Sequence, residues 1–331
     1  MAAFIVVVAG MRAAQDILIP FLLSLFIAII MMPLLNWMRS KGIPTWAAIL
    51  IIVLAILILG FLLAVLVGSS LTDFSNSLPS YQKGLRIKLA ELLVFLQDQG
   101  FAIADQTFLE FINPGAAMRL TSRILTGMGN LVGDTFLILL VVIFMLLEAA
   151  TFSQKIENAI PADSSQVDRL NTFLANINRY MVIKTWTSLG TGTIATIWLS
   201  LWGVDYALLW GLLTFLFNYI PNIGSIMAAV PPVLLALVTL GPWPAVAVAL
   251  GYLAINMTIG SFLEPRIMGK GLGLSTLVVF LSLLFWGWVL GPVGMILSVP
   301  LTMTMKIGLS SFDETQWISA LLDGGSSATK R

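Results

Sequence analysis

The sequence contains no cysteine and no histidine. Histidine is the commonest general base and metal ligand, so its absence removes the usual centre of hydrolytic and metal chemistry. Without cysteine there is neither a disulfide framework nor a thiolate metal site. The carboxylates are scattered along the chain and do not cluster as a metal cage would require. We therefore expect no catalytic residue, no bound metal and no cofactor.

Charge is also scarce. Charged residues make up 10% of the 331 residues, whereas hydrophobic residues make up 59%. A soluble domain carries about 25% charged residues. The net charge of +1 gives no reason to expect a nucleic-acid partner. The apolar runs are long enough for helices that cross a bilayer, and too long for barrel strands. The composition predicts an all-α polytopic membrane protein whose main partner is the lipid bilayer.

Residues 1–72 are predicted to hold the N-terminal membrane helices. Residues 17–38 carry no charge and are long enough to span the membrane. Arg39 and Lys41 follow directly, and cations beside the end of a span mark its cytoplasmic side. Residues 42–72 are again uncharged and are predicted to cross once more.

Residues 73–127 differ from their surroundings, because acidic and basic side chains alternate there with apolar ones. Leucines recur at helical spacing beside the charges, at Leu85, Leu89, Leu92, Leu93 and Leu96. This pattern predicts an amphipathic helical segment outside the membrane. It would lie on the bilayer surface or pack against neighbouring subunits, because its leucine face has no evident partner in a single bundle.

The remaining chain is predicted to form a transmembrane helix at 128–150 and a polar cytoplasmic helical segment at 151–187. A C-terminal transport bundle at 188–310 and a cytoplasmic tail at 311–331 follow, with the cations of the tail placing the C-terminus inside. Glycine and proline divide the bundle into pieces, several of which are too short to cross about 30 Å upright. Some pieces must therefore be broken or re-entrant helices, and we expect about seven to nine membrane segments in all.

One polar stretch, residues 264–274, interrupts this otherwise apolar bundle. Its proline and glycines predict a break in the helix. Hydrocarbon tolerates such a break only where protein or a water-filled cavity covers it. One interpretation is a cytoplasmic loop whose charges lie in water. The other is a loop that lines a polar path, in which Glu264 and Arg266, on either side of Pro265, pair to hold the break open near Lys270.

Two short segments of the bundle echo each other. Residues 221–224 read Pro-Asn-Ile-Gly and are followed by Pro231, and residues 291–294 read Gly-Pro-Val-Gly and are followed by Pro300. Broken segments in corresponding positions of two halves are typical of transporter binding sites. We expect these prolines and glycines to lie at helix ends or in unwound turns around a shared polar cavity.

These stretches fall in longer blocks of sequence. They are NYIPNIGS at 218–225, Pro231-Pro232, Asn256, EPRIMGKGLGLS at 264–275, LSLLFWGW at 281–288 and GPVGMILSVP at 291–300. The blocks resemble the signature of the autoinducer-2 exporter family, and the likeness covers nearly the whole chain. The resemblance implies a multi-pass protein of the bacterial inner membrane. It also implies a homo-oligomer, expected to be a pentamer, that exports the quorum-sensing signal autoinducer-2 without ATP hydrolysis.

Some members of this family resemble sodium–proton antiporters. Cation–proton antiport is therefore the alternative function, with Glu264, Asp134 and Asp205 as titrating carboxylates.

Autoinducer-2 is small, polyhydroxylated and largely uncharged, so its site needs hydrogen-bond donors and acceptors in a small cavity. Asparagines on apolar segments supply both kinds of group, although the same side chains also serve as hydrogen bonds between helices. The predicted substrate path comprises Asn218, Pro221, Asn222, Gly224, Pro231, Asn256, Glu264, Arg266, Lys270, Pro292, Gly294 and Pro300.

Overall fold

The computed structural model describes residues 2–98, 135–159, 165–221, 223–268, 274–310 and 313–322. Every regular element in these ranges is a helix. Four are long and apolar enough to cross a membrane: Gln15–Ser40, Thr45–Lys88, Pro242–Ile267 and Thr276–Ser310. Three shorter apolar helices accompany them: Thr135–Glu148, Ala207–Phe217 and Gly224–Thr239. The predicted all-α polytopic membrane fold is confirmed.

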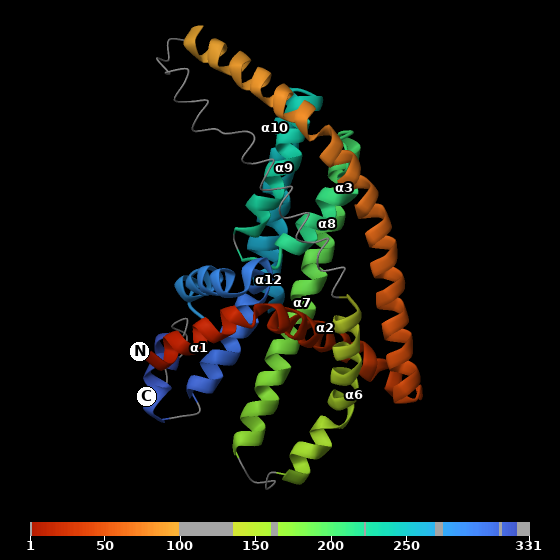
Figure 1. The fold of residues 1–331 in the computed structure, drawn as a ribbon, viewed down its shortest axis with the longest axis vertical. Coiled ribbons are helices and arrows are strands. Elements are labelled where there is room, and N and C mark those ends of the chain that lie inside the picture. The colour runs from red at the N-terminus through yellow and green to blue at the C-terminus, as the bar shows by residue number, and fades with distance from the viewer. Residues whose placement is uncertain are drawn as a thin grey trace.

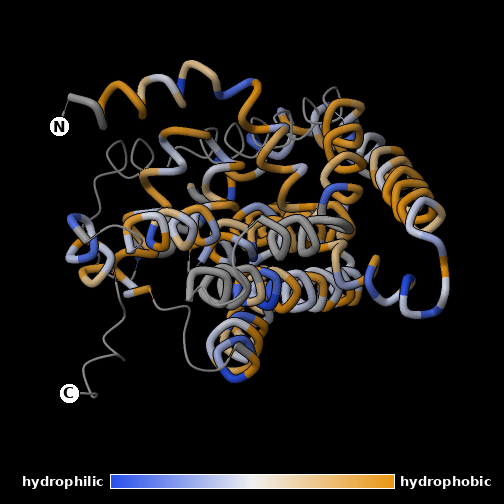
Figure 2. Tube along the Cα trace, turned by 90° about the horizontal axis from the view of Figure 1, so that it is seen from below, coloured by the Kyte–Doolittle hydropathy of each residue, from blue (hydrophilic) through white to orange (hydrophobic). Residues whose placement is uncertain are grey.

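Most of the N-terminal helices share one core, whereas Val8 of the first one packs with Trp286 and Leu290 near the C-terminus. Their bounds are α1, Ala2–Ala13; α2, Gln15–Ser40; α3, Thr45–Asp98; and α6, Thr135–Ala159. Helices α2, α3 and α6 share a core that contains Leu35, Ile52 and Val142. Ser24 of α2 adds a hydrogen bond of 3.0 Å from its hydroxyl to the carbonyl of Ile138 in α6. Hydrophobic residues run along most helices, as Figure 2 shows, and many large apolar side chains are exposed, which suits a protein surrounded by lipid.

Helix α3 continues without interruption past residue 72. It rises along one side of the molecule and its last turns project beyond α10 (Figure 1). Phe74 and Leu85 of this second part are buried in the same core as Trp210 of α8. The expectation that the leucine face lacks a partner within one chain is therefore wrong at Leu85. Amphipathic spacing shows that a face will be covered, and leaves open which element covers it. Residues 99–127 of the predicted segment fall outside the described residues.

A second packing unit follows, made of α7, Ser165–Leu201; α8, Ala207–Phe217; α9, Gly224–Thr239; and α10, Pro242–Ile255. Helices α7 and α8 approach very closely, because a Cβ atom on Gly211 would lie 2.8 Å from the carbonyl oxygen of Gly192. Small residues allow this contact between backbones inside a membrane. Trp210, Leu199 and Leu235 fill the core above it.

Helix α10 runs on through a π-helical segment, η1 (Asn256–Leu263), into a short α-helix, α11 (Glu264–Met268). The predicted break therefore does not begin at Glu264. The amide of Glu264 donates to the carbonyl of Ile259, five residues back. Pro265 then falls in the first turn of α11, where a missing donor costs little. Residues 269–273, with Lys270, are outside the described ranges.

Helix α12, Thr276–Ser310, is divided by a kink at Gly291, whose φ of 66° is left-handed. The two halves fold against each other, and the Trp286 indole donates to the Thr302 hydroxyl at 3.0 Å. A short 3₁₀ turn, η2 (Asp313–Thr315), and α13 (Gln316–Leu321) end the described chain.

The two halves of α12 form a helical hairpin that corresponds to the hairpin of α8 and α9. In the first hairpin, a Cβ on Gly224 would overlap the carbonyl of Phe217. In the second, a Cβ on Gly294 would overlap the carbonyl of Trp286. The echo noted in the sequence thus coincides with two turns of similar construction.

Some of the prolines and glycines that were predicted to lie at helix ends or in unwound turns do lie there. Pro221 lies in the turn between α8 and α9, Gly224 begins α9, and Pro292 directly follows the kink. Gly294 lies in the first turn after the kink, at the start of the second half of α12, as expected. Pro231 and Pro300 lie within helices, so the expectation of a helix end or an unwound turn is wrong there. Membrane helices tolerate interior proline because neighbouring groups satisfy the freed carbonyls.

Candidate functional site

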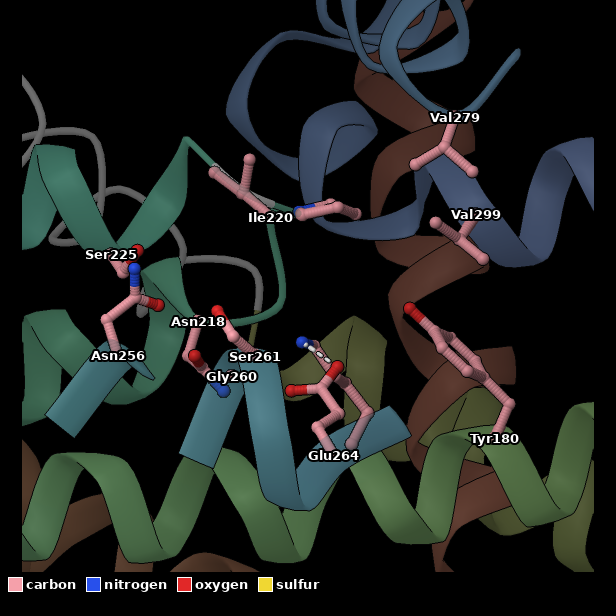
Figure 3. Close-up of a pocket in the computed structure, with 12 residues that line it drawn as sticks. Tyr180, Asn218, Ile220, Ser225, Asn256, Gly260, Ser261, Glu264, Val279 and Val299 are labelled. Carbon is pink, nitrogen blue, oxygen red and sulfur yellow. Dashed lines mark hydrogen bonds and ion pairs between the residues drawn. The ribbon is translucent and has the colours of Figure 1, made fainter. Parts of the chain in front are cut away.

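A cavity of about 190 Å³ lies where α7, the turn before α9, η1 and α12 meet. Its lining comprises Tyr180, Lys184, Asn218, Ile220, Pro221, Ser225, Asn256, Gly260, Ser261, Glu264, Val279 and Val299. Figure 3 shows Glu264 in the middle of this group. Ser225, Asn256, Asn218 and Ser261 lie on one side of it, and Tyr180 with the two valines lies on the other.

A buried ion pair crosses the cavity. The Nζ atom of Lys184 in α7 lies 2.6 Å from Oε1 of Glu264 in α11, and only 6% and 13% of these side chains are exposed. The two residues are 80 positions apart in the sequence. Among the described residues that line the cavity, these two are the charged ones, so the formal charges of the lining cancel. Removing one partner of a buried pair costs about 3–5 kcal/mol, because the other charge is left uncompensated.

Arg266 has a different environment. Its guanidinium carbon lies 3.6 Å from the centre of the Phe262 ring, which is 57% exposed. The predicted pair between Glu264 and Arg266 is therefore wrong, since Glu264 pairs with Lys184. The physical reason is that the helix continues through Pro265, so residues two apart point about 200° from each other around the axis.

This environment predicts that Arg266→Ala has little effect on the transport rate. A cation over an exposed ring contributes about 0.5–1 kcal/mol, and the side chain does not line the cavity. We expect the transport rate to change by less than about threefold, which corresponds to about 0.65 kcal/mol. Efflux from proteoliposomes at equal protein content would measure it, and a loss as large as that of Glu264→Ala would contradict this assignment.

Two of the three predicted asparagines line the cavity. Asn218 is buried, and its side-chain amide donates to the hydroxyl of Ser188 in α7 at 3.0 Å. Asn256, at the start of η1, faces Ser225 across the turn (Figure 3). Asn222 falls outside the described residues. The same turn is attached to α7 by Tyr219, whose hydroxyl donates to Thr185 at 2.8 Å.

Comparison with known proteins places this arrangement in a family. The model of the AI-2E family transporter matches residues 1–312. The chain belongs to the AI-2E transporter family. The AI-2 transport protein TqsA of Escherichia coli K12 is 42% identical over 318 residues, which cover 96% of this chain and 92% of TqsA.

Other relatives span nearly the whole length as well. A putative transport protein of Haemophilus influenzae is 44% identical, covering 97% of this chain and 94% of its own. The putative transport protein YhhT of Escherichia coli K12 is 37% identical, with coverage of 98% and 93%. Membership in the AI-2E family indicates a transport role in a multi-pass membrane protein.

The structure brings together only part of the predicted substrate path of this AI-2E transporter. Asn218, Pro221, Asn256 and Glu264 line the cavity. Six predicted residues are not in its lining: Gly224, Pro231, Arg266, Pro292, Gly294 and Pro300. Asn222 and Lys270 lie in the part of the chain that the structure leaves undescribed.

Sequence reasoning missed Lys184 and Tyr180, which it assigned to a polar cytoplasmic segment. Both are buried and line the cavity. The available signal was helical spacing, since Lys184, Ser188 and Thr191 recur at i, i+4 and i+7 and are all buried. Such a stripe predicts one polar helix face directed into a bundle.

The cavity of this AI-2E transporter has the properties of a site for a small polar solute. A volume of about 190 Å³ equals that of roughly six waters at ~30 Å³ each. Amide, hydroxyl, ammonium and carboxylate groups line one side, and Val279 and Val299 supply an apolar wall. Ser261 is exposed, so the cavity reaches the protein surface there. A few convergent polar groups against an apolar wall fix the orientation of a small ligand.

Proposed function

We propose that this protein exports autoinducer-2, a small polyhydroxylated signal, across the bacterial inner membrane without ATP hydrolysis and without catalysing a reaction. The cavity around Lys184 and Glu264 is its substrate site. The similarity to a protein named for AI-2 transport, which extends over 96% of the chain, supports this choice of substrate. The observation that carries the assignment is the lining of the cavity, which is polar and formally neutral.

A formally neutral lining suits an uncharged ligand. An anionic substrate would need a surplus of cations, and Lys184 is already compensated by Glu264. Hydroxyl groups on a ligand can both donate and accept, and the side chains of Asn218, Asn256 and Ser225 offer both functions. A ligand lacking these hydroxyls would leave buried polar groups unpaired, which costs about 1–3 kcal/mol for each group.

Efflux from proteoliposomes tests the proposal. Vesicles that contain the purified protein and labelled autoinducer-2 should release the label faster than protein-free vesicles, with and without a proton gradient. Tyr180→Phe removes one hydroxyl from the cavity wall and keeps the ring, so it should slow release of the signal. Release no faster than in protein-free vesicles would refute the assignment of substrate.

Cation–proton antiport is the second candidate, because a buried carboxylate lies in a cavity at Glu264. Asp205 is exposed in the turn before α8 and does not line the cavity, and Asp134 lies outside the described ranges. Acidification or alkalinisation of vesicles on addition of sodium, followed with a pH-sensitive dye, would favour this candidate over signal export.

We also propose that the protein is a homopentamer with its C-terminus in the cytoplasm. Large apolar side chains on α3, such as Leu57, Phe61 and Leu62, are exposed and are available to lipid or to a second copy. Native mass spectrometry gives the number of subunits. Because the chain has no cysteine, Ser326→Cys places a single thiol in the tail. An impermeant maleimide should label it in inside-out vesicles and not in intact spheroplasts.

A further inference from the structure

Gly260, which lines the cavity, has a backbone carbonyl without a partner in either α or π register. In α register the carbonyl of Gly260 would accept from the amide of Glu264, but that amide donates to Ile259. In π register it would accept from residue 265, which is proline and has no amide hydrogen. The π-helical segment and Pro265 together therefore leave this acceptor of a cavity-lining residue unused within the helix.

Other oxygen-bearing groups line the same cavity. The Glu264 carboxylate and the side chains of Ser261, Asn218 and Asn256 line the cavity with Gly260 (Figure 3). Backbone carbonyls released at a helix discontinuity coordinate sodium in many transporters. Hard cations prefer such oxygen ligands.

A cation already lies in this cavity: the Lys184 ammonium, 2.6 Å from Oε1 of Glu264. We propose that Lys184 is a resident substitute for an alkali cation, so that the substrate site is complete without sodium. This rests on the proposed function, since the cavity is the same. A tethered ammonium supplies the positive charge that Glu264 requires at all times. Transport by the natural protein is therefore indifferent to sodium, and loss of the ammonium creates a sodium site.

The first test needs no substrate. Thermal unfolding of the purified full-length protein in detergent is measured in sodium, potassium and choline chloride at equal ionic strength. In Lys184→Ala, space opens beside Glu264, and saturating sodium should raise the midpoint by about 5 °C over choline. The natural protein should show equal midpoints in sodium and in choline.

Three variants separate a sodium site from general loss of charge. Lys184→Met fills the space with an apolar chain, so sodium should not raise its midpoint. Lys184→Arg keeps a cation, so its midpoint, like that of the natural protein, should be the same in sodium and in choline. Lys184→Ala combined with Glu264→Gln lacks the carboxylate and should lose the sodium response. Equal midpoints in sodium and choline for Lys184→Ala, its failure to fold even in sodium, or a sodium response in the natural protein would each overturn the proposal.

Transport supplies the second readout. Efflux of autoinducer-2 by Lys184→Ala should be at least about tenfold faster in sodium than in choline, whereas efflux by the natural protein should not change. If the natural protein releases no autoinducer-2 while Lys184→Ala still gains a sodium-dependent midpoint, the assignment of substrate fails and the resident-cation proposal stands. If efflux by Lys184→Ala is equally slow in both salts, the resident-cation proposal fails alone.

Discussion

Glu264→Ala should abolish transport and destabilise the protein by about 3–5 kcal/mol, because it leaves the buried ammonium of Lys184 without a partner. This contrasts with an exposed ion pair, whose loss would cost about 0–1 kcal/mol. Chemical or thermal unfolding in detergent measures the stability, and efflux from proteoliposomes measures the activity.

A double-mutant cycle identifies the cause. The variant that carries both Glu264→Ala and Lys184→Ala contains no unpaired charge, so in choline it should be more stable than Glu264→Ala alone. It should still transport poorly, because the cavity has lost its charged groups. Additive effects of the two substitutions on stability would show that the pair is not coupled, and would contradict the ion pair as the origin of the loss.

The second large effect is expected at the two hairpin turns. Gly224→Ala and Gly294→Ala each place a methyl group on a backbone carbonyl, of Phe217 and of Trp286 respectively. A carbonyl in a packed helix cannot move aside as a flexible side chain can, so each hairpin must open. We expect destabilisation at the upper end of the about 1–3 kcal/mol typical of overpacking, with loss of transport in both variants. Thermal unfolding and efflux measure the two effects.

Two helix glycines provide matched controls, because alanine should raise the stability at these positions instead of lowering it. A methyl group on Gly190 of α7 or Gly308 of α12 would meet no atom within 4 Å. Alanine in a helix interior is favoured over glycine by roughly 0.5–1 kcal/mol, so both controls should be slightly stabilised. Similar stabilities for Gly224→Ala and Gly308→Ala would show that the close approach in the first hairpin is not rigid.

Apolar length made the fold class predictable, since long uncharged runs allow only helices in a bilayer. The turns at Pro221 and Gly291 were also predictable, because proline interrupts the helical hydrogen bonds and glycine allows backbone angles that other residues avoid. The break expected over residues 264–274 begins only after Met268, because the π-helical segment absorbs the proline. That outcome depends on which carbonyl the Glu264 amide reaches, and residue types do not specify it.

The site was predictable where polarity was unusual for its surroundings. Asn218, Asn256 and Glu264 stand out in apolar segments, and all three line the cavity. Lys184 did not stand out, because it follows a segment with several charged residues. Its partner is 80 residues away, and no local pattern connects the two. Because charged residues are scarce in this part of the chain, Glu264 stood out in the sequence. Only the folded structure shows that its partner is Lys184 and not Arg266.

The π-helical segment also determines the direction in which Glu264 points. A π-helical turn holds one more residue than an α-helical turn, as a single insertion would produce, and such turns are frequent at functional sites. If the same eight residues, Asn256–Leu263, were wound in α register, the extra residue would add to the rotation of the helix instead of being absorbed by the wider turn. Everything after it would then rotate by about 100° around the helix axis. The carboxylate would leave Lys184, although every cavity-lining side chain outside the segment would still be present. The direction in which Glu264 points, set by the π-helical winding of eight residues, is thus as necessary to this site as the identity of the residues that line it.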